Sequence, residues 1–234
     1  MSMFRLAALS VLAVVLAGCA SNPNEMSFQK QFLSEAKARF AKNDATANQR
    51  AAIESMSRKQ LSGIGDNPTI LIDLETLRQY GTLFQISKNG DSDVFMTFDN
   101  KTITFEHGVM VATRGLGADL MWLDATETLA AMKSRTVKST TTKRIHKTLD
   151  GENRATGQVF DCRYKETGRQ KVVSVHKQFN LTRITEDCAS ESKPGAEYSN
   201  EYWVDIPTGI IWKSRQWAGP VIGYLAIDVL IPAK

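Results

Sequence analysis

Residues 102–113 read Thr102-Ile103-Thr104-Phe105-Glu106-His107-Gly108-Val109-Met110-Val111-Ala112-Thr113. Residues that favour β-strands fill both halves of this stretch. His107-Gly108 between them suits a tight turn, because glycine tolerates a positive φ angle. The stretch therefore predicts two antiparallel strands, at residues 102–106 and 109–113, joined by a hairpin turn.

Short strands and turn residues continue in both directions from this hairpin. Before it, strands are expected at residues 69–74, 82–87 and 94–98, with turns at Asn89-Gly90 and Asp99-Asn100. After it, a short helix is expected at 125–133, and long alternating segments at 136–149, 157–165 and 171–185. The last expected strands are 198–206, 210–217 and 221–231, with corners at Pro207-Thr208-Gly209 and Gly219-Pro220.

The segment before the strands is expected to be helical. One helix is predicted over residues 26–40 and a second over 46–61, before Gly63. The apolar residues that share one face of the first helix are Phe28, Phe32, Leu33, Ala36 and Phe40. We expect these amphipathic helices to pack against the sheet, with a place at a bilayer surface as the alternative.

The arrangement of these elements predicts the fold class. Strands do not alternate with long helices, so a doubly wound parallel sheet is not favoured. The prediction is a mainly β fold, in which a large antiparallel meander sheet curls into a half or full barrel. Residues 26–234 form one domain in this interpretation, with a helical preface at 26–65 and an antiparallel β body at 66–234.

The extreme N-terminus has the order of a bacterial signal peptide. Arg5 is followed by an apolar run from Leu6 to Leu16, and Leu16-Ala17-Gly18-Cys19 places small residues directly before a cysteine. A membrane-spanning helix needs about 20 apolar residues, so this run is too short to be one. The ending resembles the bacterial lipobox, which predicts a signal peptide over residues 1–18 and lipidation of Cys19.

A lipidated Cys19 predicts that acyl chains alone hold the mature protein on a membrane, each buried methylene contributing about 0.8 kcal/mol. Residues 19–25 are polar, contain Pro23 and are expected to form a tether. Ala20 after the cysteine, in place of Asp, indicates sorting to the outer membrane, with the protein facing the periplasm. No cofactor is expected other than the covalent acyl lipid on Cys19.

The charge of the mature chain argues against a nucleic-acid partner. Removal of residues 1–18 takes away one of the 29 Lys and Arg residues and leaves 28 against 25 Asp and Glu residues, a net charge of +3. Nucleic-acid-binding surfaces usually carry a pronounced excess of positive charge.

The sequence contains no recognisable catalytic or metal-binding motif. His107, His146 and His176 have no metal-ligand spacing with one another or with a cysteine, and they are expected to be solvated surface residues. G-x-S-x-G, Walker and HExxH patterns are absent from the sequence. Gly115 and Gly117 lack the third glycine of a dinucleotide-binding loop and are interpreted as bend residues. We therefore expect a protein that is not an enzyme and has no metal site.

Cys162 and Cys188 remain as two thiols once Cys19 is lipidated. The periplasm oxidises such pairs. A disulfide requires Cα atoms within about 7 Å, a condition that neighbouring antiparallel strands meet. We therefore predict a Cys162–Cys188 disulfide.

Three tryptophans, Trp203, Trp212 and Trp217, surround the corner at Pro207-Thr208-Gly209. Aromatic clusters on a sheet can stack on the apolar face of a sugar ring, but they are more often part of the protein core. Both interpretations stay open at this point.

Two stretches of the chain resemble the YjbF/GfcB lipoproteins, a family associated with exopolysaccharide and group 4 capsule gene clusters. The first runs from Ile103 to Leu116 and ends in Thr113-Arg114-Gly115-Leu116. The second lies between Tyr202 and Pro220 and includes Thr208-Gly209 and Trp212-Lys213-Ser214-Arg215-Gln216. Family members usually have Gly-Arg where this chain has Gly108-Val109, so no role is transferred to a basic residue there.

The resemblance implies an outer-membrane lipoprotein with an all-β body that assists polysaccharide secretion and has no established catalytic site. It makes the Thr113–Leu116 motif (Thr113, Arg114, Gly115 and Leu116) and the three tryptophans candidates for contacts with a partner or a glycan. Polysaccharide or polysaccharide-export proteins are the partners it implies, besides the membrane.

Two other functions remain open from the sequence. A curled sheet with helices over its mouth would suit a carrier for an apolar, lipid-like ligand, and an apolar cavity is the feature that would favour it. A polysaccharide-modifying enzyme would need two carboxylates about 5 to 10 Å apart in a cleft.

Overall fold

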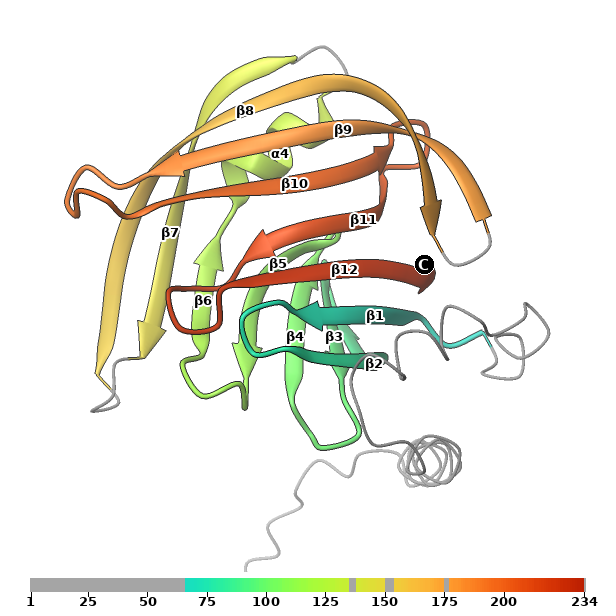
Figure 1. Cartoon of the computed structure of the whole chain (residues 1–234), viewed down its shortest axis with the longest axis horizontal. Coiled ribbons are helices and arrows are strands. Elements are labelled where there is room, and N and C mark those ends of the chain that lie inside the picture. Colours follow the sequence, from blue (N-terminus) through green and yellow to red (C-terminus); the bar gives the residue numbers. More distant parts are fainter. Residues whose placement is uncertain (1–65, 135–137, 150–153, 175–176, 234) are drawn as a thin grey trace, which may run out of the picture. The chain divides into compact units, whose positions relative to one another are not determined.

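The computed structural model describes residues 66–134, 138–149, 154–174 and 177–233. Within these residues, one 12-stranded sheet and the helix α4 (Thr126–Lys133) form the body of the protein (Figure 1). The strands are β1 (Thr69–Leu74), β2 (Gln79–Asn89), β3 (Ser92–Met96), β4 (Thr102–Glu106), β5 (Val109–Arg114), β6 (Leu120–Asp124), β7 (Ser139–Leu149), β8 (Ala155–Ser174), β9 (Lys177–Ala189), β10 (Glu197–Asp205), β11 (Ile210–Trp217) and β12 (Tyr224–Ile231).

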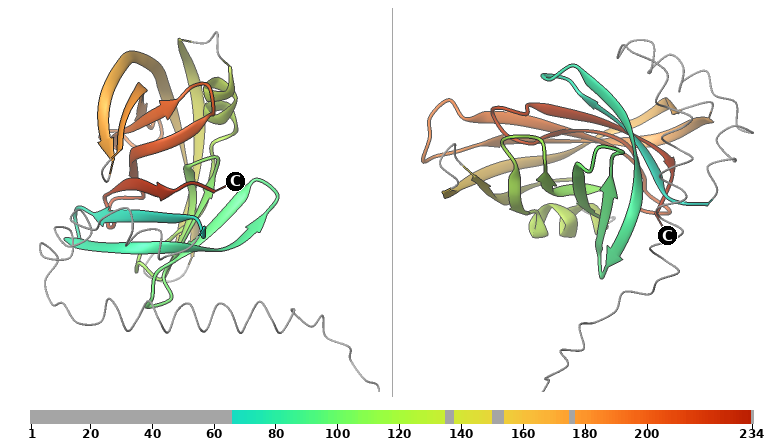
Figure 2. Two further views of the ribbon diagram at one scale, coloured as in Figure 1. Left: turned by 90° about the vertical axis from the view of Figure 1, so that its right-hand side faces the viewer. Right: turned by 90° about the horizontal axis from the view of Figure 1, so that it is seen from below.

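The sheet is an antiparallel meander that is nearly closed into a barrel. Its strand order is β5-β4-β3-β2-β1-β12-β11-β10-β9-β8-β7-β6, so sheet neighbours are also chain neighbours except where β1 pairs with β12. The two edge strands, β5 and β6, are joined by residues 115–119 alone. Two further views show the strands curling around an interior (Figure 2). The predicted curled antiparallel sheet is confirmed.

Side-chain alternation along the strands explains this curl. In β10, buried and partly exposed residues alternate from Tyr198 to Asp205. Successive side chains of a strand point to opposite faces, so one face of β10 lines the interior and the other meets solvent. Burial of one face favours a sheet that closes on itself.

Most of the predicted turns are present in the structure at the predicted residues. Asn100 and His107 have positive φ angles of 65° and 49°, and Gly90 and Gly108 also lie in this region at 59° and 83°. These residues connect β2 to β3, β3 to β4 and β4 to β5. The helix expected at 125–133 is α4.

Two strand predictions were wrong. The segment expected as one strand at 171–185 contains the end of β8 at Ser174 and the start of β9 at Lys177, and β6 was not expected at all. Gly168 has a φ angle of 110° at a register shift, so the chain bulges there and β8 continues to pair with β9. In β6, Leu120-Met121-Trp122-Leu123 is an apolar run without alternation, so it carries no strand period.

The β8–β9 hairpin extends beyond β10 and packs against the following strands. Ser174 Oγ donates a hydrogen bond to the Val229 carbonyl of β12 over 3.4 Å. The Phe179 ring lies 4.3 Å from the Trp212 ring of β11, centroid to centroid. These contacts hold the end of the long hairpin beside β11 and β12 (Figure 1).

The interior holds one large apolar core and a smaller aromatic cluster. The large core gathers side chains from both edges of the sheet, including Val109 of β5 and Leu123 of β6, and α4 adds Leu129 and Ala131. The smaller cluster consists of Phe160, Cys162, Cys188 and Tyr198, with Trp217 and Tyr224 packed against it. Burial of these side chains favours the closed form of the sheet.

The predicted disulfide is present in the structure. Cys162 and Cys188 are directly opposite residues of β8 and β9, and their Cα atoms lie 4.0 Å apart. Both cysteines are buried in the smaller cluster. The bridge therefore links two strands that the sheet already pairs.

Several predictions concern residues outside the described part of the chain. They are the signal peptide at 1–18, Cys19, the tether at 19–25, the helical preface at 26–65 and the position of His176. All of these stay predictions. Among the described residues, none of the helical structure is long and apolar enough to traverse a bilayer.

Candidate functional site

A buried ion pair lies at the centre of the interior. Arg144 of β7 and Glu186 of β9 are 1% and 0% exposed, and Arg144 Nε donates to Glu186 Oε1 over 2.8 Å. Burial by itself lowers the pKa of Arg144, but the charge of Glu186 more than offsets this effect and raises it. Arg144 is therefore charged at neutral pH.

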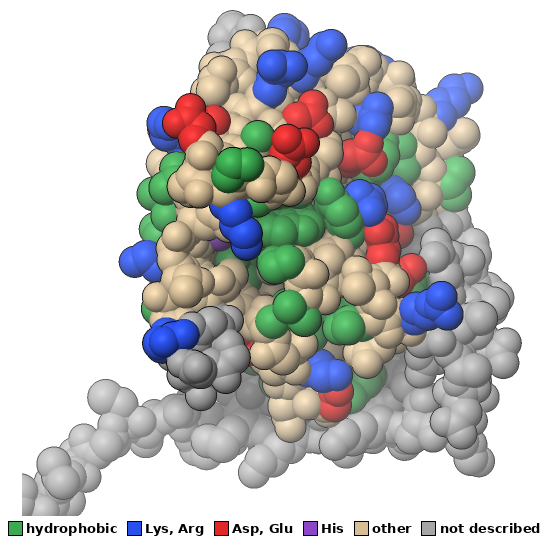
Figure 3. All heavy atoms as spheres, turned by 60° about the vertical axis from the view of Figure 1, so that its left-hand side comes forward, with side chains coloured by type: hydrophobic (Ala, Val, Ile, Leu, Met, Phe, Trp, Pro, Cys, Tyr) green, Lys and Arg blue, Asp and Glu red, His purple; other side chains and the backbone are tan. Residues whose placement is uncertain are grey.

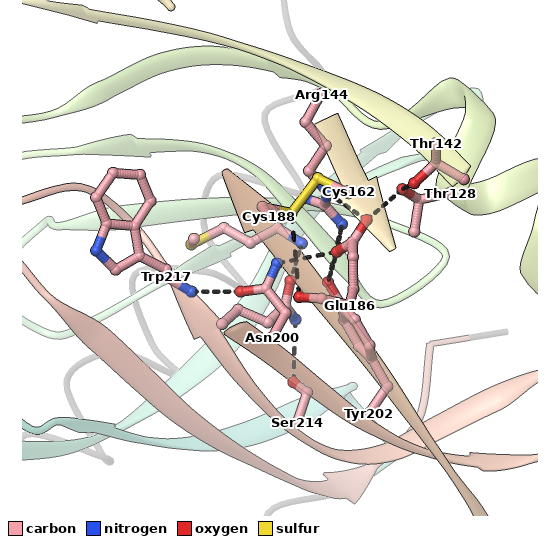
Figure 4. A network of polar contacts seen from close by, with 12 residues as sticks. Thr128, Thr142, Arg144, Cys162, Glu186, Cys188, Asn200, Tyr202, Ser214 and Trp217 are labelled. Carbon is pink, nitrogen blue, oxygen red and sulfur yellow. Dashed lines mark hydrogen bonds and ion pairs between the residues drawn. A yellow bond between two sulfur atoms is a disulfide. The ribbon is translucent and has the colours of Figure 1, made fainter. Parts of the chain in front are cut away.

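Further polar side chains complete the Glu186 network, which comprises Thr128, Thr142, Arg144, Glu186, Asn200 and Tyr202 (Figure 4). Arg144 donates to the Tyr202 hydroxyl over 2.9 Å, and Asn200 Nδ2 donates to Glu186 Oε2 over 3.0 Å. Burial raises the pKa of Tyr202 well above its usual value, so this phenol stays neutral. Asn200 also accepts a hydrogen bond from the Trp217 backbone N–H over 2.8 Å.

The Glu186 network also fixes α4. Thr128 of α4 donates a hydrogen bond from Oγ1 to Glu186 Oε1, and it contacts the Thr142 hydroxyl of β7 over 3.4 Å. Thr128 is fully buried. This polar contact adds to the apolar packing of Leu129 and Ala131 in attaching the short helix to the interior of the barrel.

His146 contradicts the expectation of a solvated surface histidine. Its side chain lies in the smaller cluster at 2% exposure, 4.9 Å from the Phe160 ring, and its Nε2 shares a 2.9 Å hydrogen bond with the Tyr198 hydroxyl. Burial, followed by the charge of Arg144, lowers its pKa to about 3. Because β7 alternates inward and outward residues, the inward position of His146 follows from its register with Arg144. His107, in contrast, is exposed as expected and lies 3.3 Å from Asp91.

The Thr113–Leu116 motif closes the opening between β5 and β6. The Arg114 guanidinium donates to the Leu120 and Met121 carbonyls of β6, each over 3.0 Å. Thr113 Oγ1 accepts from the Leu120 N–H over 3.0 Å. β5 and β6 are the unpaired edge strands of the sheet, and these side-chain hydrogen bonds connect them in place of backbone hydrogen bonds. The motif therefore has a structural role at this position.

Asp119 holds the loop that links these two strands. Its carboxylate accepts from Thr113 Oγ1 and from the Leu116 N–H, both over 3.0 Å, and from the Gly115 N–H over 2.7 Å. Gly115 and Gly117 have positive φ angles of 84° and 102°. The interpretation of these glycines as bend residues is confirmed.

The two stretches that resemble the lipoprotein family meet inside the barrel. Gln216 of β11 donates from Nε2 to the Gly108 carbonyl over 2.9 Å and accepts at Oε1 from the Met110 N–H over 2.8 Å. The Gln216 amide thus provides hydrogen-bond partners for two backbone groups of the hairpin between β4 and β5. Gln216 is 1% exposed, so loss of these bonds would leave buried polar groups without partners.

A pocket of about 360 Å³, called the mouth pocket here, opens at the end of the barrel where β4 ends and β11 begins. Phe95, Phe105, Ile211, Ile227 and Val229 are among its apolar lining residues. A polar rim consists of Lys88, Asp93, His107 and Thr208, and the buried Ser214 adds one hydroxyl to the inner wall. Its volume lies in the range of small-molecule sites, about 300 to 1,000 Å³.

A second hollow, of about 290 Å³, adjoins the mouth pocket and reaches α4. The two share His107, Thr208, Gly209 and Ile211. The α4 side of the hollow carries Leu129, Met132 and Lys133. The family stretch at 103–116 therefore supplies His107 to both hollows, and the stretch at 202–220 supplies the corner Thr208-Gly209.

A polar groove covers the strands around the disulfide. It has a volume of about 640 Å³ and is lined by Asp161, Arg163, Asp187, Glu197 and Ser199, among others. Asp161 is paired with Lys143 over 2.5 Å, and Asp187 accepts from Ser199 Oγ over 2.6 Å. On one face of the molecule, acidic and basic side chains are interspersed around an apolar centre (Figure 3).

The three tryptophans have separate surroundings. Trp203 donates from Nε1 to Gln170 Oε1 over 3.0 Å, and Trp212 packs on Phe179. Trp217 stacks on Tyr198 with a centroid distance of 4.5 Å and an angle of 10°. All three are partly exposed and engaged with other residues, so they do not form one shared aromatic surface.

One group of described residues has the composition of a metal site. Ligand atoms of Cys162, Glu186 and Cys188 lie within 4.8 Å of one another. The two sulfur atoms are bonded to each other, and Glu186 is paired with Arg144. These three residues therefore form a disulfide beside an ion pair, and the bonded cysteines have no free thiolate with which to bind a metal ion.

Comparison with protein families identifies the chain. The family described as "Group 4 capsule polysaccharide lipoprotein gfcB, YjbF" matches residues 25–230. The chain belongs to this family. Membership in this lipoprotein family implies a lipid membrane anchor and an association with capsule polysaccharide.

A solved structure from the same comparisons supports the fold. The crystal structure of the hypothetical lipoprotein YmcC from Escherichia coli (K12) is similar with a TM-score of 0.66 and 16% sequence identity. The match covers 82% of this chain and 98% of that one. At this identity the likeness shows a shared fold. A comparison with curated proteins finds none that matches this chain.

Several central residues were missed by reasoning from the sequence. Arg144 and Glu186 lie in strands with many other charged residues, and nothing in their local pattern separates them from solvated ones. Alternation within β7 gave a weak signal, since Thr142, Arg144 and His146 share one face with a period of two. Gln216 belonged to the family stretch but had no role assigned.

Proposed function

We propose that this lipoprotein is a non-enzymatic accessory in the assembly or export of a capsule or exopolysaccharide, and that it acts by binding. It is lipid-anchored through Cys19 to the outer membrane and faces the periplasm. Family membership supports the link to capsule polysaccharide. The signal sequence and Ala20 support the location.

The observation that carries the binding role is the state of the interior polar groups. Arg144 and Glu186 are satisfied by each other and by the rest of the Glu186 network. Groups that are fully buried and paired stabilise a structure, whereas catalytic groups must reach a substrate. The hollows at the barrel mouth and the polar groove are the surfaces left for ligands or partners.

A carrier role for an apolar ligand is a second candidate, because the mouth pocket is an apolar cavity. The third candidate, a polysaccharide-modifying enzyme, would have to use carboxylates such as Asp161 and Asp187 in the polar groove. Both are occupied by neighbouring side chains, which argues against that use.

Two measurements test the proposed function. In a strain that lacks this protein, complementation with the wild-type chain should restore surface polysaccharide. Purified protein incubated with that polysaccharide should leave its size distribution and composition unchanged. Shortening or chemical change of the polymer, lost in an Asp161→Asn or Asp187→Asn variant that still folds, would establish an enzyme. Unchanged surface polysaccharide in the strain without the protein would remove the accessory role.

A further inference from the structure

We propose that the mouth pocket binds one alkyl chain of an amphiphilic molecule. The inference rests on the proposed binding role and names the class of ligand. It depends on the shape and chemistry of the pocket.

The deep walls of the pocket are apolar except for the hydroxyl of Ser214, which accepts a hydrogen bond from Gln216. Phe95, Phe105 and Ile227 are each 4% exposed, and Ile211 and Val229 continue the same wall. These residues also belong to the large core or pack against it, so the pocket is a gap in the barrel interior that opens to the surface. An alkyl chain in this gap would bury apolar surface on all sides, which favours binding.

The same walls disfavour a sugar. Among the described residues, the buried side-chain polar atoms without a hydrogen-bond partner are His146 Nδ1 and Gln158 Nε2, and neither residue lines the pocket. The several hydroxyls of a sugar inside it would lose water and find few partners besides the Ser214 hydroxyl on those walls, a strongly unfavourable exchange. A glycan portion of the ligand would therefore stay outside.

The rim supplies groups for a polar end. Lys88 and Asp93 form an ion pair over 3.9 Å at one side, and His107, with its partner Asp91, lies at another. Thr208 adds a hydroxyl from the corner between β10 and β11. Apolar walls with a polar rim match a molecule that has one apolar tail and one polar head.

Gly108 keeps the pocket wall in place. A Cβ atom at this residue would lie 3.1 Å from Ile211 Cβ, so any larger residue would displace Ile211. Gly108 also has a positive φ angle of 83°. The glycine of the family stretch therefore defines the position of one wall.

A fluorescent fatty acid tests the proposal directly. The full-length Cys19→Ser chain should bind dansyl-labelled undecanoic acid with increased fluorescence. Val229→Trp should fill the pocket and weaken this binding by about tenfold or more. The matched control is Val221→Trp, because Val221 is 58% exposed in the turn between β11 and β12 and lies outside the pocket. This control should bind like the parent chain.

A second variant covers the case in which Val229→Trp does not fold. Ile211→Ala enlarges the pocket, so it should keep binding and shift preference toward bulkier tails. Thermal unfolding of each variant establishes that it is folded. Absence of binding by the Cys19→Ser chain, or equal binding by a folded Val229→Trp variant, would overturn the inference. If the inference fails in this way but the wild-type chain still restores surface polysaccharide in the strain that lacks the protein, the proposed function remains intact.

The alkyl chain could come from a separate lipid or from the protein's own anchor. Lipidated protein extracted from membranes distinguishes the two sources. If the anchor occupies the pocket, the lipidated form should fail to bind the probe, whereas the Cys19→Ser form binds it. If a separate lipid is the ligand, both forms should bind. A soluble oligosaccharide should not displace the probe in either form, and displacement would contradict the apolar assignment.

Discussion

At the scale of single residues, burial decides how the ionisable groups behave. His146 and His107 belong to the same residue type, yet one lies among aromatic rings and the other at an exposed turn. Arg144 stays charged in the interior because Glu186 pairs with it over 2.8 Å. Two predictions follow from these contrasts.

The pKa of His146 predicts a loss of stability in acid. The unfolded chain takes up a proton near pH 6.5, whereas the folded protein does so only near pH 3. Between these values the unfolded state binds more protons, so the free energy of unfolding should fall as the pH falls through this range. This group alone should remove about 3 kcal/mol between pH 7 and pH 4, at about 1.4 kcal/mol per pH unit.

Urea unfolding at a series of pH values measures this effect. The His146→Phe variant should lose less stability on acidification than the wild type. His107→Asn, which changes an exposed histidine to a residue that tolerates a positive φ angle, is the matched control for the loss of a histidine. Parallel curves for His146→Phe and the wild type would show that His146 is not the group responsible.

Removal of one partner of the buried ion pair should be strongly destabilising. Glu186→Gln leaves the buried Arg144 charge without compensation, and we expect a loss of about 3 to 5 kcal/mol in urea unfolding. Arg144→Met with Glu186→Leu removes both charges and should recover much of the loss. A single variant within about 0.5 kcal/mol of the wild type would mean that the pair is solvated in solution.

At the scale of elements, the barrel depends on two kinds of cross-strand connection. Backbone hydrogen bonds join eleven pairs of neighbouring strands, from the β5–β4 pair at one edge of the sheet to the β7–β6 pair at the other. The β5–β6 opening relies on the side chains of the Thr113–Leu116 motif and Asp119. The disulfide adds a covalent link between β8 and β9.

Arg114→Lys should loosen the opening between β5 and β6. A lysine has no planar fork and cannot reproduce the bonds to the Leu120 and Met121 carbonyls. Amide hydrogen exchange should become faster in β5 and β6, with little change elsewhere. The matched control is Arg163→Lys, the same substitution on the exposed face of β8, which should leave amide exchange in β5 and β6 unaltered. Unchanged exchange in the Arg114 variant would contradict the role of this side chain.

Loss of the disulfide should lower stability without changing the fold. The bridge spans a sequence separation of 26, for which the chain-entropy argument gives about 3.5 kcal/mol. The Cys162→Ala and Cys188→Ala double variant should therefore unfold at lower urea concentration and keep its β-sheet circular dichroism. Reduction of the wild type should give a similar shift. Two separately alkylatable thiols in protein taken from the periplasm would show that the bridge does not form there.

At the scale of the whole molecule, a nearly closed barrel belongs to a chain whose lipoprotein family implies a membrane anchor. The Glu186 network and the two apolar clusters occupy the interior, and the mouth pocket opens at one end. Membership in a lipoprotein family supports the attachment. The proposed anchor, Cys19, lies in a different part of the sequence from the residues of the mouth pocket.

Cys19→Ser tests the attachment. We expect this variant to remain unprocessed or to appear in the soluble periplasmic fraction, because the acyl chains are the anchor that the sequence predicts. Cell fractionation combined with mass spectrometry of the N-terminus measures both outcomes. A matched Cys188→Ser variant should stay membrane-bound. If Cys19→Ser is cleaved after residue 18 and still sediments with the outer membrane, another part of the chain attaches it.

The amino-acid sequence alone was enough to predict features that depend on local order. Alternation and turn residues predicted an antiparallel sheet and placed β4, β5 and β11 closely, because a strand has a period of two that can be read within a few residues. The disulfide could be predicted because only two cysteines remain besides Cys19, which the sequence predicts to be lipidated. The two stretches that resemble the family could be recognised from the sequence, but their contacts could not. The sequence also left open whether the three tryptophans belong to the core or the surface.

Only the tertiary structure decided which distant residues meet. Arg144 and Glu186 are 42 positions apart, and Gln216 and Gly108 are 108 positions apart. Their contacts depend on the register of every intervening strand and on how tightly the sheet curls, and a shift of one residue would turn each side chain to the other face. The buried His146, the closure by Arg114 and the mouth pocket follow from that register. They are therefore properties of the closed sheet, whereas the strands themselves are properties of the local sequence.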